Sequence, residues 1–234
     1  MSSTKRLLAV AGTCGICLLW ASGFAAEPGF EPIFNGKDLT GWDGNPKLWS
    51  VKDGAITAQT TAAEPIKENT FLIWTNGTLS DFELRFSYRI VAGNSGVQYR
   101  SKVLDPKKWI VGGYQADFEA GKTFSGILYE ERMSRGIMAA RGEKVVWDKE
   151  GKKQVVGSVG DSAQIQATIK NEDWNDYVII AQGPHLQHFI NGKQTIDVID
   201  ETEGKRAESG VLALQVHVGP PMTVQFKNIR LKKL

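Results

Sequence analysis

The stretch FELRFSYRI, at residues 82–90, decides the fold because its side chains alternate strictly between apolar and polar. The aromatic and aliphatic residues fall on one side of an extended chain, and the charged and hydroxyl side chains fall on the other. A period of two residues is typical of a β-strand with one buried face. The stretch therefore predicts a sheet that covers an apolar core with one of its faces.

Segments on both sides of this stretch continue the strand pattern. Asp53-Gly54 and Asn191-Gly192 each separate two short apolar runs, and such dipeptides favour tight β-hairpin turns. Helical periodicity is nearly absent. Further strands are expected at residues 96–101, 113–118, 165–169, 177–182, 210–218 and 222–231, whereas residues 141–161 form either a long hairpin or a mobile loop. We predict an all-β fold, a two-layer antiparallel β-sandwich of the jelly-roll type, in one domain over residues 26–234.

The first 25 residues have the pattern of a secretory signal peptide. Lys5 and Arg6 precede an apolar run at residues 7–20, and small residues follow it. The run is shorter than the roughly 20 residues of a membrane-spanning helix, so an uncleaved anchor is the less favoured alternative. We expect cleavage after Ala25, export to the periplasm or the extracellular space, and no stable membrane span after cleavage.

Composition excludes several classes of function for the mature chain. The predicted signal contains both cysteines, Cys14 and Cys17, which leaves no thiol for a disulfide or a redox motif. It also contains two of the 28 basic residues, so the remaining 26 balance the 26 acidic residues. This balance gives no indication of a nucleic acid partner.

Polar side chains gather on one face of several predicted strands. Sorting by alternation, provided that no β-bulge intervenes, gives three sets: Asn94, Gln98 and Arg100; Gln115, Asp117 and Glu119; and Gln215 and His217. Amides, carboxylates and an imidazole are suited to directional hydrogen bonds with sugar hydroxyls. We expect these sets to form one carbohydrate-directed patch. The alternative is an ordinary wet sheet face with scattered polar residues.

Other residues extend this patch or give it a second chemistry. Tyr129 and Glu131 are candidates for its rim, and His188 lies among apolar neighbours on another predicted strand. Two carboxylates on one strand face repel each other unless a cation lies between them. The cation is either a divalent metal ion, bound by Asp117, Glu119 and His217, or the guanidinium of Arg100.

The chain also resembles the 3-keto-disaccharide hydrolase domain family of the concanavalin A-like lectin and glucanase superfamily. The matching segments are residues 34–42 (FNGKDLTGW), 49–54 (WSVKDG), 93–100 (GNSGVQYR), 113–117 (GYQAD), 174–177 (WNDY), 188–192 (HFING), 214–217 (LQVH) and 226–230 (FKNIR). The resemblance implies a concanavalin A-like jelly roll. It also implies action on glycosides or disaccharides whose sugar is oxidised to a ketone at C3, with no organic cofactor.

Cleavage of such a sugar needs a base at C2 and an electrophile at the C3 oxygen. His217 is the first candidate for the base and Glu119 the second, while Arg100 or a divalent metal ion would stabilise the enolate. The side chains expected to hold the substrate are Asn94, Gln98, Gln115, Tyr129, Glu131, His188 and Gln215. Two alternatives remain open: a non-catalytic, lectin-like glycan-binding module of the same fold, and a structural domain with an inert face.

Overall fold

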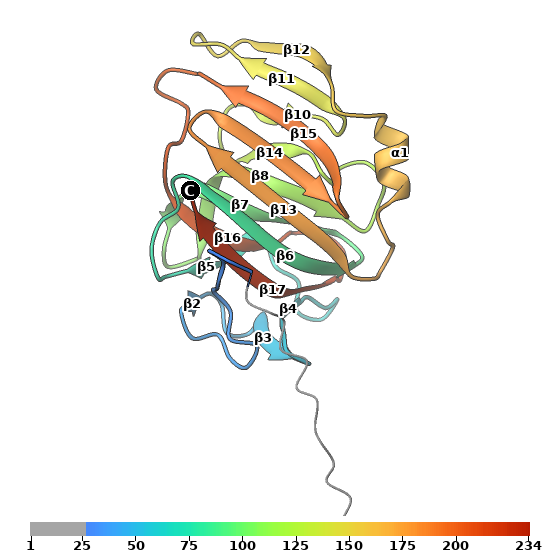
Figure 1. Cartoon of the computed structure of the whole chain (residues 1–234). Helices are drawn as coiled ribbons and strands as arrows, with labels where there is room; N and C mark the ends of the chain where they lie inside the picture. Colours follow the sequence, from blue (N-terminus) through green and yellow to red (C-terminus); the bar gives the residue numbers. More distant parts are fainter. Residues whose placement is uncertain (1–26) are drawn as a thin grey trace, which may run out of the picture.

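The computed structural model describes residues 27–234, and its strands form two sheets that pack face to face (Figure 1). The predicted signal segment and both cysteines lie outside the described residues. Within residues 27–234, no helix has the length and apolar character that are needed to cross a bilayer.

The larger sheet has ten strands in the described part of the chain. Its path is β12-β11-β15-β14-β13-β6-β17-β4-β3, and β1 pairs with β17 beside this path. The strands are β1 (Glu31–Pro32), β3 (Trp49–Lys52), β4 (Ala55–Gln59), β6 (Phe82–Val91), β11 (Glu143–Trp147), β12 (Lys153–Ser158), β13 (Asn175–Gln182), β14 (His185–Ile190), β15 (Lys193–Asp200) and β17 (Thr223–Lys233).

The smaller sheet has seven strands over the same residues, in the order β10-β9-β8-β7-β16-β5-β2. These strands are β2 (Trp42–Asp43), β5 (Thr70–Trp74), β7 (Asn94–Asp105), β8 (Ile110–Glu119), β9 (Leu128–Glu131), β10 (Gly136–Ala139) and β16 (Val211–Val216). Neighbouring strands pair antiparallel in both sheets, with the exception of β11 and β15, which are parallel. The predicted two-layer jelly-roll sandwich is confirmed.

The alternation that predicted the fold is visible in β6. Phe82, Leu84, Phe86, Tyr88 and Ile90 are all buried and belong to one core cluster between the sheets. Both predicted hairpins are also present, as β3–β4 and β14–β15. Their turn residues have positive φ, at 50° and 73° in the first turn and at 48° and 76° in the second. This conformation explains the Asp-Gly and Asn-Gly pairs.

Two segments between β10 and β13 clarify or correct the sequence analysis. Residues 141–161 form the hairpin of β11 and β12. The strand predicted at residues 165–169 is wrong, because Ser162–Ala167 form the helix α1. Asp161 caps this helix by accepting a hydrogen bond from the Gln164 N–H at 2.8 Å. A short run of alternating apolar residues fits either structure, and the capping residue favours the helix.

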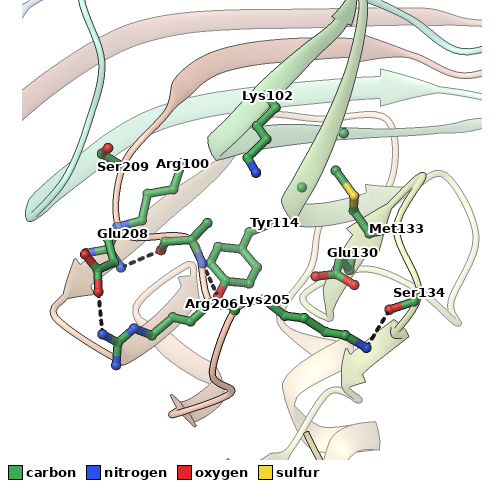
Figure 2. Close-up of a pocket in the computed structure, with 14 residues that line it drawn as sticks. Arg100, Lys102, Tyr114, Glu130, Met133, Ser134, Lys205, Arg206, Glu208 and Ser209 are labelled. Atoms are coloured by element: carbon green, nitrogen blue, oxygen red, sulfur yellow. Dashed lines mark hydrogen bonds and ion pairs between the residues drawn. The ribbon is translucent and has the colours of Figure 1, made fainter. Parts of the chain in front are cut away.

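Arg100 does not share the face of Asn94 and Gln98, so its expected position in the patch is wrong. A register shift between β7 and β8 follows Tyr99, and Arg100 itself has a φ of 48°. This bulge turns the side chain to the end of the sandwich, where Figure 2 shows it near Glu208 and Tyr114. There the guanidinium is 1% exposed and donates to Ser80 O at 2.6 Å and to Gly183 O at 2.7 Å.

Arg100 therefore joins the two sheets. It lies on β7 of the smaller sheet, whereas Gly183 forms the turn between β13 and β14 of the larger one. Asp81 completes the link, because its carboxylate accepts from Arg100 at 2.9 Å and from the Gly183 N–H at 2.9 Å. The guanidinium thus has a structural role at this end of the molecule.

We expect Arg100→Met to lower the free energy of unfolding by about 3 kcal/mol, because it leaves buried carbonyl oxygens and Asp81 without their donor. Urea unfolding at neutral pH measures this loss. Arg206→Met, which removes a half-buried guanidinium from the same end of the molecule, should cost less than about 1 kcal/mol. Equal losses in the two variants would contradict the assignment.

Candidate functional site

The outer face of the smaller sheet carries most of the predicted polar side chains. Residues directly opposite each other on paired strands point to the same side of a sheet. The opposed pairs across β7, β8 and β9 are Asn94 with Glu119, Gly96 with Asp117, Gln98 with Gln115, and Gln115 with Tyr129. The predicted sharing of one face is confirmed for these residues.

Part of this face is covered by the chain itself. The segment between β7 and β8 curls back over the sheet and hydrogen-bonds to β5, where the Phe71 N–H donates to Trp109 O and the Thr70 hydroxyl donates to Lys108 O, both at 3.0 Å. A second apolar cluster fills the covered part, with Phe71, Ile73, Val111 and Ala213 at its centre. The outer face of the smaller sheet therefore has a closed half, which this segment covers, and an open half, which it leaves uncovered.

Three glutamines form a hydrogen-bonded row at the closed half. The Ser101 hydroxyl donates to Gln98 Oε1 at 2.6 Å, and Gln98 Nε2 donates to Gln115 Oε1 at 2.7 Å. Gln115 Nε2 then donates to Gln215 Oε1 at 3.3 Å. A Cβ at Gly96 would lie 2.6 Å from the Gln115 side chain, so a glycine is required beneath it. Gln98 and Gln215 are fully buried, so they support Gln115 and do not face solvent.

The open half is a hollow of about 560 Å³. Six of the predicted site residues line it, namely Asn94, Gln115, Asp117, Tyr129, Glu131 and His217. They come from β7, β8, β9 and the end of β16, which alternation alone brings to one side of the sheet. The hollow combines amides, carboxyls, a phenol and an imidazole with the guanidinium of Arg132. This composition can bind several hydroxyl groups at once.

Asp117 is the most perturbed of these groups. Its side chain is buried, and Oδ1 has no hydrogen-bond partner within residues 27–234. Burial raises the pKa of this carboxyl well above its usual value, and hydrogen bonds from Asn94 and the Phe118 N–H oppose the shift only in part. Burial therefore favours the protonated form of this carboxyl more than in an exposed aspartate, and in that form the carboxyl can donate a hydrogen bond.

His217 lies just beyond β16 at the mouth of the hollow. Its Nδ1 is 2.5 Å from the carbonyl oxygen of Val218, an acceptor that places a proton on Nδ1, so that in the neutral ring Nε2 is the nitrogen with the lone pair. The following segment is held by Asn69, whose Oδ1 accepts from the Val218 N–H at 2.9 Å and whose Nδ2 donates to Glu131 Oε1 at 3.0 Å. Sequence reasoning missed Asn69, because a single asparagine before a strand gives no local signal.

Glu119 turns away from this hollow toward its own loop. Its Oε1 accepts from the backbone N–H of Thr123 at 2.5 Å and of Phe124 at 2.9 Å. Across the described residues 27–234, no three His, Cys, Asp or Glu side chains are grouped so that they could bind a metal ion. Asp117, Glu119 and His217 therefore do not form the ligand set that their spacing predicted.

His188 lies in the core between the sheets, so its expected contact with a ligand on the outer face is wrong. Its ring is fully buried, with Nε2 2.9 Å from the Tyr99 hydroxyl and Nδ1 3.2 Å from the Tyr177 hydroxyl. Burial lowers the pKa of this imidazole to about 3. A neutral histidine with two phenol partners is a satisfied core residue.

Comparison with known proteins adds a family and a fold. The model of the 3-keto-alpha-glucoside-1,2-lyase-like domain family matches residues 29–232 of the chain. No curated protein matches the chain. The chain thus aligns with this family over almost its whole described length.

Several solved structures share the fold at low sequence identity. A Parabacteroides distasonis protein with the provisional description of glycosyl hydrolase is 20% identical, with a TM-score of 0.57 over 88% of this chain and 99% of that chain. The carbohydrate binding module CBM66 from Bacillus subtilis is 16% identical, with a TM-score of 0.53 over 84% and 98% of the two chains. A Bacillus subtilis protein of unknown function with a galectin-like fold is 10% identical, with a TM-score of 0.51 over 83% and 90%.

The raised pKa of Asp117 predicts a pH dependence of stability. The folded protein holds the proton more tightly than the unfolded chain, whose aspartates have a pKa of about 3.9. This contribution to stability is complete below the unfolded pKa and is lost as the pH rises through the folded pKa. Asp117→Asn should therefore be more stable than the parent at pH 8, and the gain should shrink toward pH 4 in urea unfolding.

Both proteins contain His188, so its titration cancels in the difference between their free energies of unfolding. Asp43→Asn, which changes an exposed carboxyl, serves as the control and should stay within about 0.5 kcal/mol of the parent at every pH. A gain for Asp117→Asn that does not change between pH 4 and pH 8 would show that the buried carboxyl is not the cause.

Proposed function

The chain belongs to the 3-keto-alpha-glucoside-1,2-lyase-like domain family, and from this membership and the chemistry of the hollow we propose that it cleaves glycosides whose sugar carries a ketone at C3. The observation that carries the proposal is the presence of a buried carboxyl with a raised pKa and an imidazole, Asp117 and His217, in one amide-lined hollow. A carboxyl with a raised pKa in a cleft is typical of catalytic sites, and Asp117 has this property.

The proposed reaction begins at C2 of the sugar. The neighbouring ketone makes the C2 proton acidic, and a base removes it to form an enolate. The electron pair of the enolate then expels the oxygen substituent at C1, which takes up a proton, and a C1–C2 double bond remains. Water adds across this double bond, with its oxygen at C1 and its proton at C2. The net result is hydrolysis of the glycosidic bond without the carboxylate pair of an ordinary glycosidase.

In this proposal His217 is the base, and its unprotonated Nε2 accepts the C2 proton. The protonated carboxyl of Asp117 donates to the C3 oxygen, where negative charge develops. It takes the place that the sequence analysis gave to Arg100, which lies at the end of the sandwich. A neutral acid in a buried position acts there without the desolvation cost of a charge.

Four other polar residues of the lining hold the sugar in this proposal. Asn94 and Gln115 present amides, Tyr129 a phenol, and Glu131 a carboxylate that Asn69 orients. Their mixture of donors and acceptors matches the hydroxyl groups of a pyranose ring. We further propose that residues 1–25 direct the chain to export, so that it acts on its carbohydrate in the periplasm or outside the cell.

His217→Ala and Asp117→Asn should each lower kcat/KM by at least 100-fold with 4-nitrophenyl 3-keto-β-glucoside, which corresponds to about 2.7 kcal/mol of transition-state stabilisation. Release of nitrophenol measures the rate. His185→Ala removes a histidine that lies on the larger sheet and pairs with Asp197, and it should leave kcat/KM within about twofold of the parent.

The reaction in heavy water tests the proposed route directly. The product sugar should carry deuterium at C2, because the proton that returns there comes from solvent, and the uncatalysed exchange is subtracted in a parallel sample without protein. Hydrolysis without deuterium at C2 would contradict the route. Binding of unoxidised glycans without turnover of the 3-keto substrate would instead identify a lectin-like module.

A further inference from the structure

A second hollow, of about 800 Å³, is lined in part by α1, the helix that Figure 1 shows at the edge of the sandwich. Tyr88 and Ile90 at the end of β6 form one side of this end pocket, and residues 119–122 after β8 form another. The helix α1 and residues 169–172 complete it. The end pocket lies outside the hollow of Asp117, and nothing in the proposed reaction uses it.

The walls of the end pocket are fixed by the hydrogen bonds of two polar side chains. Arg141 donates to Ser162 O at 3.1 Å, to Ser125 O at 2.7 Å and to Lys122 O at 2.9 Å, and so ties the loop after β8 to the start of α1. On the opposite wall Asn175 exchanges two hydrogen bonds with the backbone of Lys170, both at 2.8 Å. The pocket is therefore formed before any ligand arrives, which reduces the entropy lost on binding.

Two of the lining residues carry buried polar atoms that lack partners. Within residues 27–234, neither the Tyr88 hydroxyl nor Gln166 Oε1 has a hydrogen-bond partner. An unmade hydrogen bond of a buried group costs about 1–3 kcal/mol, so a ligand that supplies the partner recovers this free energy. The phenol is a donor and the amide oxygen an acceptor, and this pair matches a hydroxyl-bearing molecule.

The charges around the end pocket favour an uncharged ligand. Three cationic and three anionic side chains line it, namely Lys122, Arg141 and Lys170 with Glu119, Asp161 and Glu172. The cation Arg141 is held by carbonyl oxygens and so is not available to a free anion. The balance leaves no net attraction for either sign of charge.

The end pocket also adjoins the candidate site. Glu119, Ala120 and Gly121 line both the end pocket and a small surface hollow next to it. That small hollow shares Asn94 and His217 with the hollow of Asp117. A polar track thus runs along the ends of β7 and β8 from one pocket to the other.

We propose that the end pocket is a second carbohydrate-binding site, which holds an uncharged sugar ring between the Tyr88 hydroxyl and Gln166. The ring is a further unit of the glycan whose reactive sugar lies beside Asp117. This inference rests on the proposed function only for the chemical class of the ligand. It extends the substrate from a short glycoside to an oligosaccharide.

Isothermal titration with maltotriose and cellotriose tests the proposal with two neutral trisaccharides. Ala167→Trp fills the end pocket from α1, and it should weaken the binding of the better probe at least tenfold. Gln164→Trp places the same bulk on a residue of α1 that does not line the pocket, and it should leave the affinity unchanged. Equal affinities of Ala167→Trp and the parent, or no binding of either probe by the parent, would overturn the proposal.

Tyr88→Phe provides a second readout that a folding defect cannot imitate. Removing an unpartnered buried hydroxyl should leave the melting temperature of the free protein unchanged or higher, while the trisaccharide affinity falls about tenfold. A lower melting temperature with unchanged affinity would contradict the assignment of this hydroxyl to a ligand.

The test separates this inference from the proposed function. Ala167→Trp should leave turnover of the short methyl 3-keto-glucoside unchanged, because the hollow of Asp117 is intact. Loss of trisaccharide binding in Ala167→Trp supports the end pocket even if the parent does not cleave the 3-keto substrate. Normal cleavage together with undiminished trisaccharide binding in Ala167→Trp overturns only the end pocket.

Discussion

The register between β7 and β8 determines which side chains of these strands point into the candidate site. Gln98 opposite Gln115 and Gly96 opposite Asp117 place the polar side chains on the outer face, and the residues between them face the core. A slip of one residue would exchange the two faces of a strand. The inner face prevents this slip, because Phe118 stacks on Tyr88 of the other sheet with 4.0 Å between ring centroids. The geometry of the polar hollow is therefore a consequence of aromatic packing on the opposite side of the sheet.

The same sheet carries interactions that cost stability. Asp117 Oδ1 and Gln215 Nε2 are buried without partners among residues 27–234, although more than 90% of buried polar groups in proteins are paired. The glutamine row fixes Gln115 from behind, while the bulge at Arg100 removes a guanidinium that could have neutralised Asp117. Without that cation the carboxyl remains in a medium that favours its protonated form. The position of Arg100 away from this face therefore contributes to the raised pKa of Asp117.

Sequence alone predicted the features that depend on a two-residue period. The sandwich, the hairpin turns and six of the residues in the hollow are all consequences of alternation and turn chemistry. Three errors have a common origin in local exceptions to that period. A bulge in β7 turns the Arg100 side chain to the end of the sandwich. The capping residue Asp161 favours helix α1 where a strand was predicted. The carboxylate of Glu119 accepts hydrogen bonds from the backbone of its own loop. Asn69 was missed because its partners, Val218 and Glu131, are distant in sequence.

The choice between a catalyst and a simple glycan-binding module depends on what the carboxyl of Asp117 adds. A module that only binds hydroxyl groups would gain as much from an asparagine at this position, because an amide donates and accepts without titrating. A buried carboxyl imposes a pH-dependent cost on folding that an amide does not. Proton donation to a developing negative charge is the property that distinguishes the acid from the amide. Together with the imidazole of His217 at the same hollow, this argument favours the catalytic proposal.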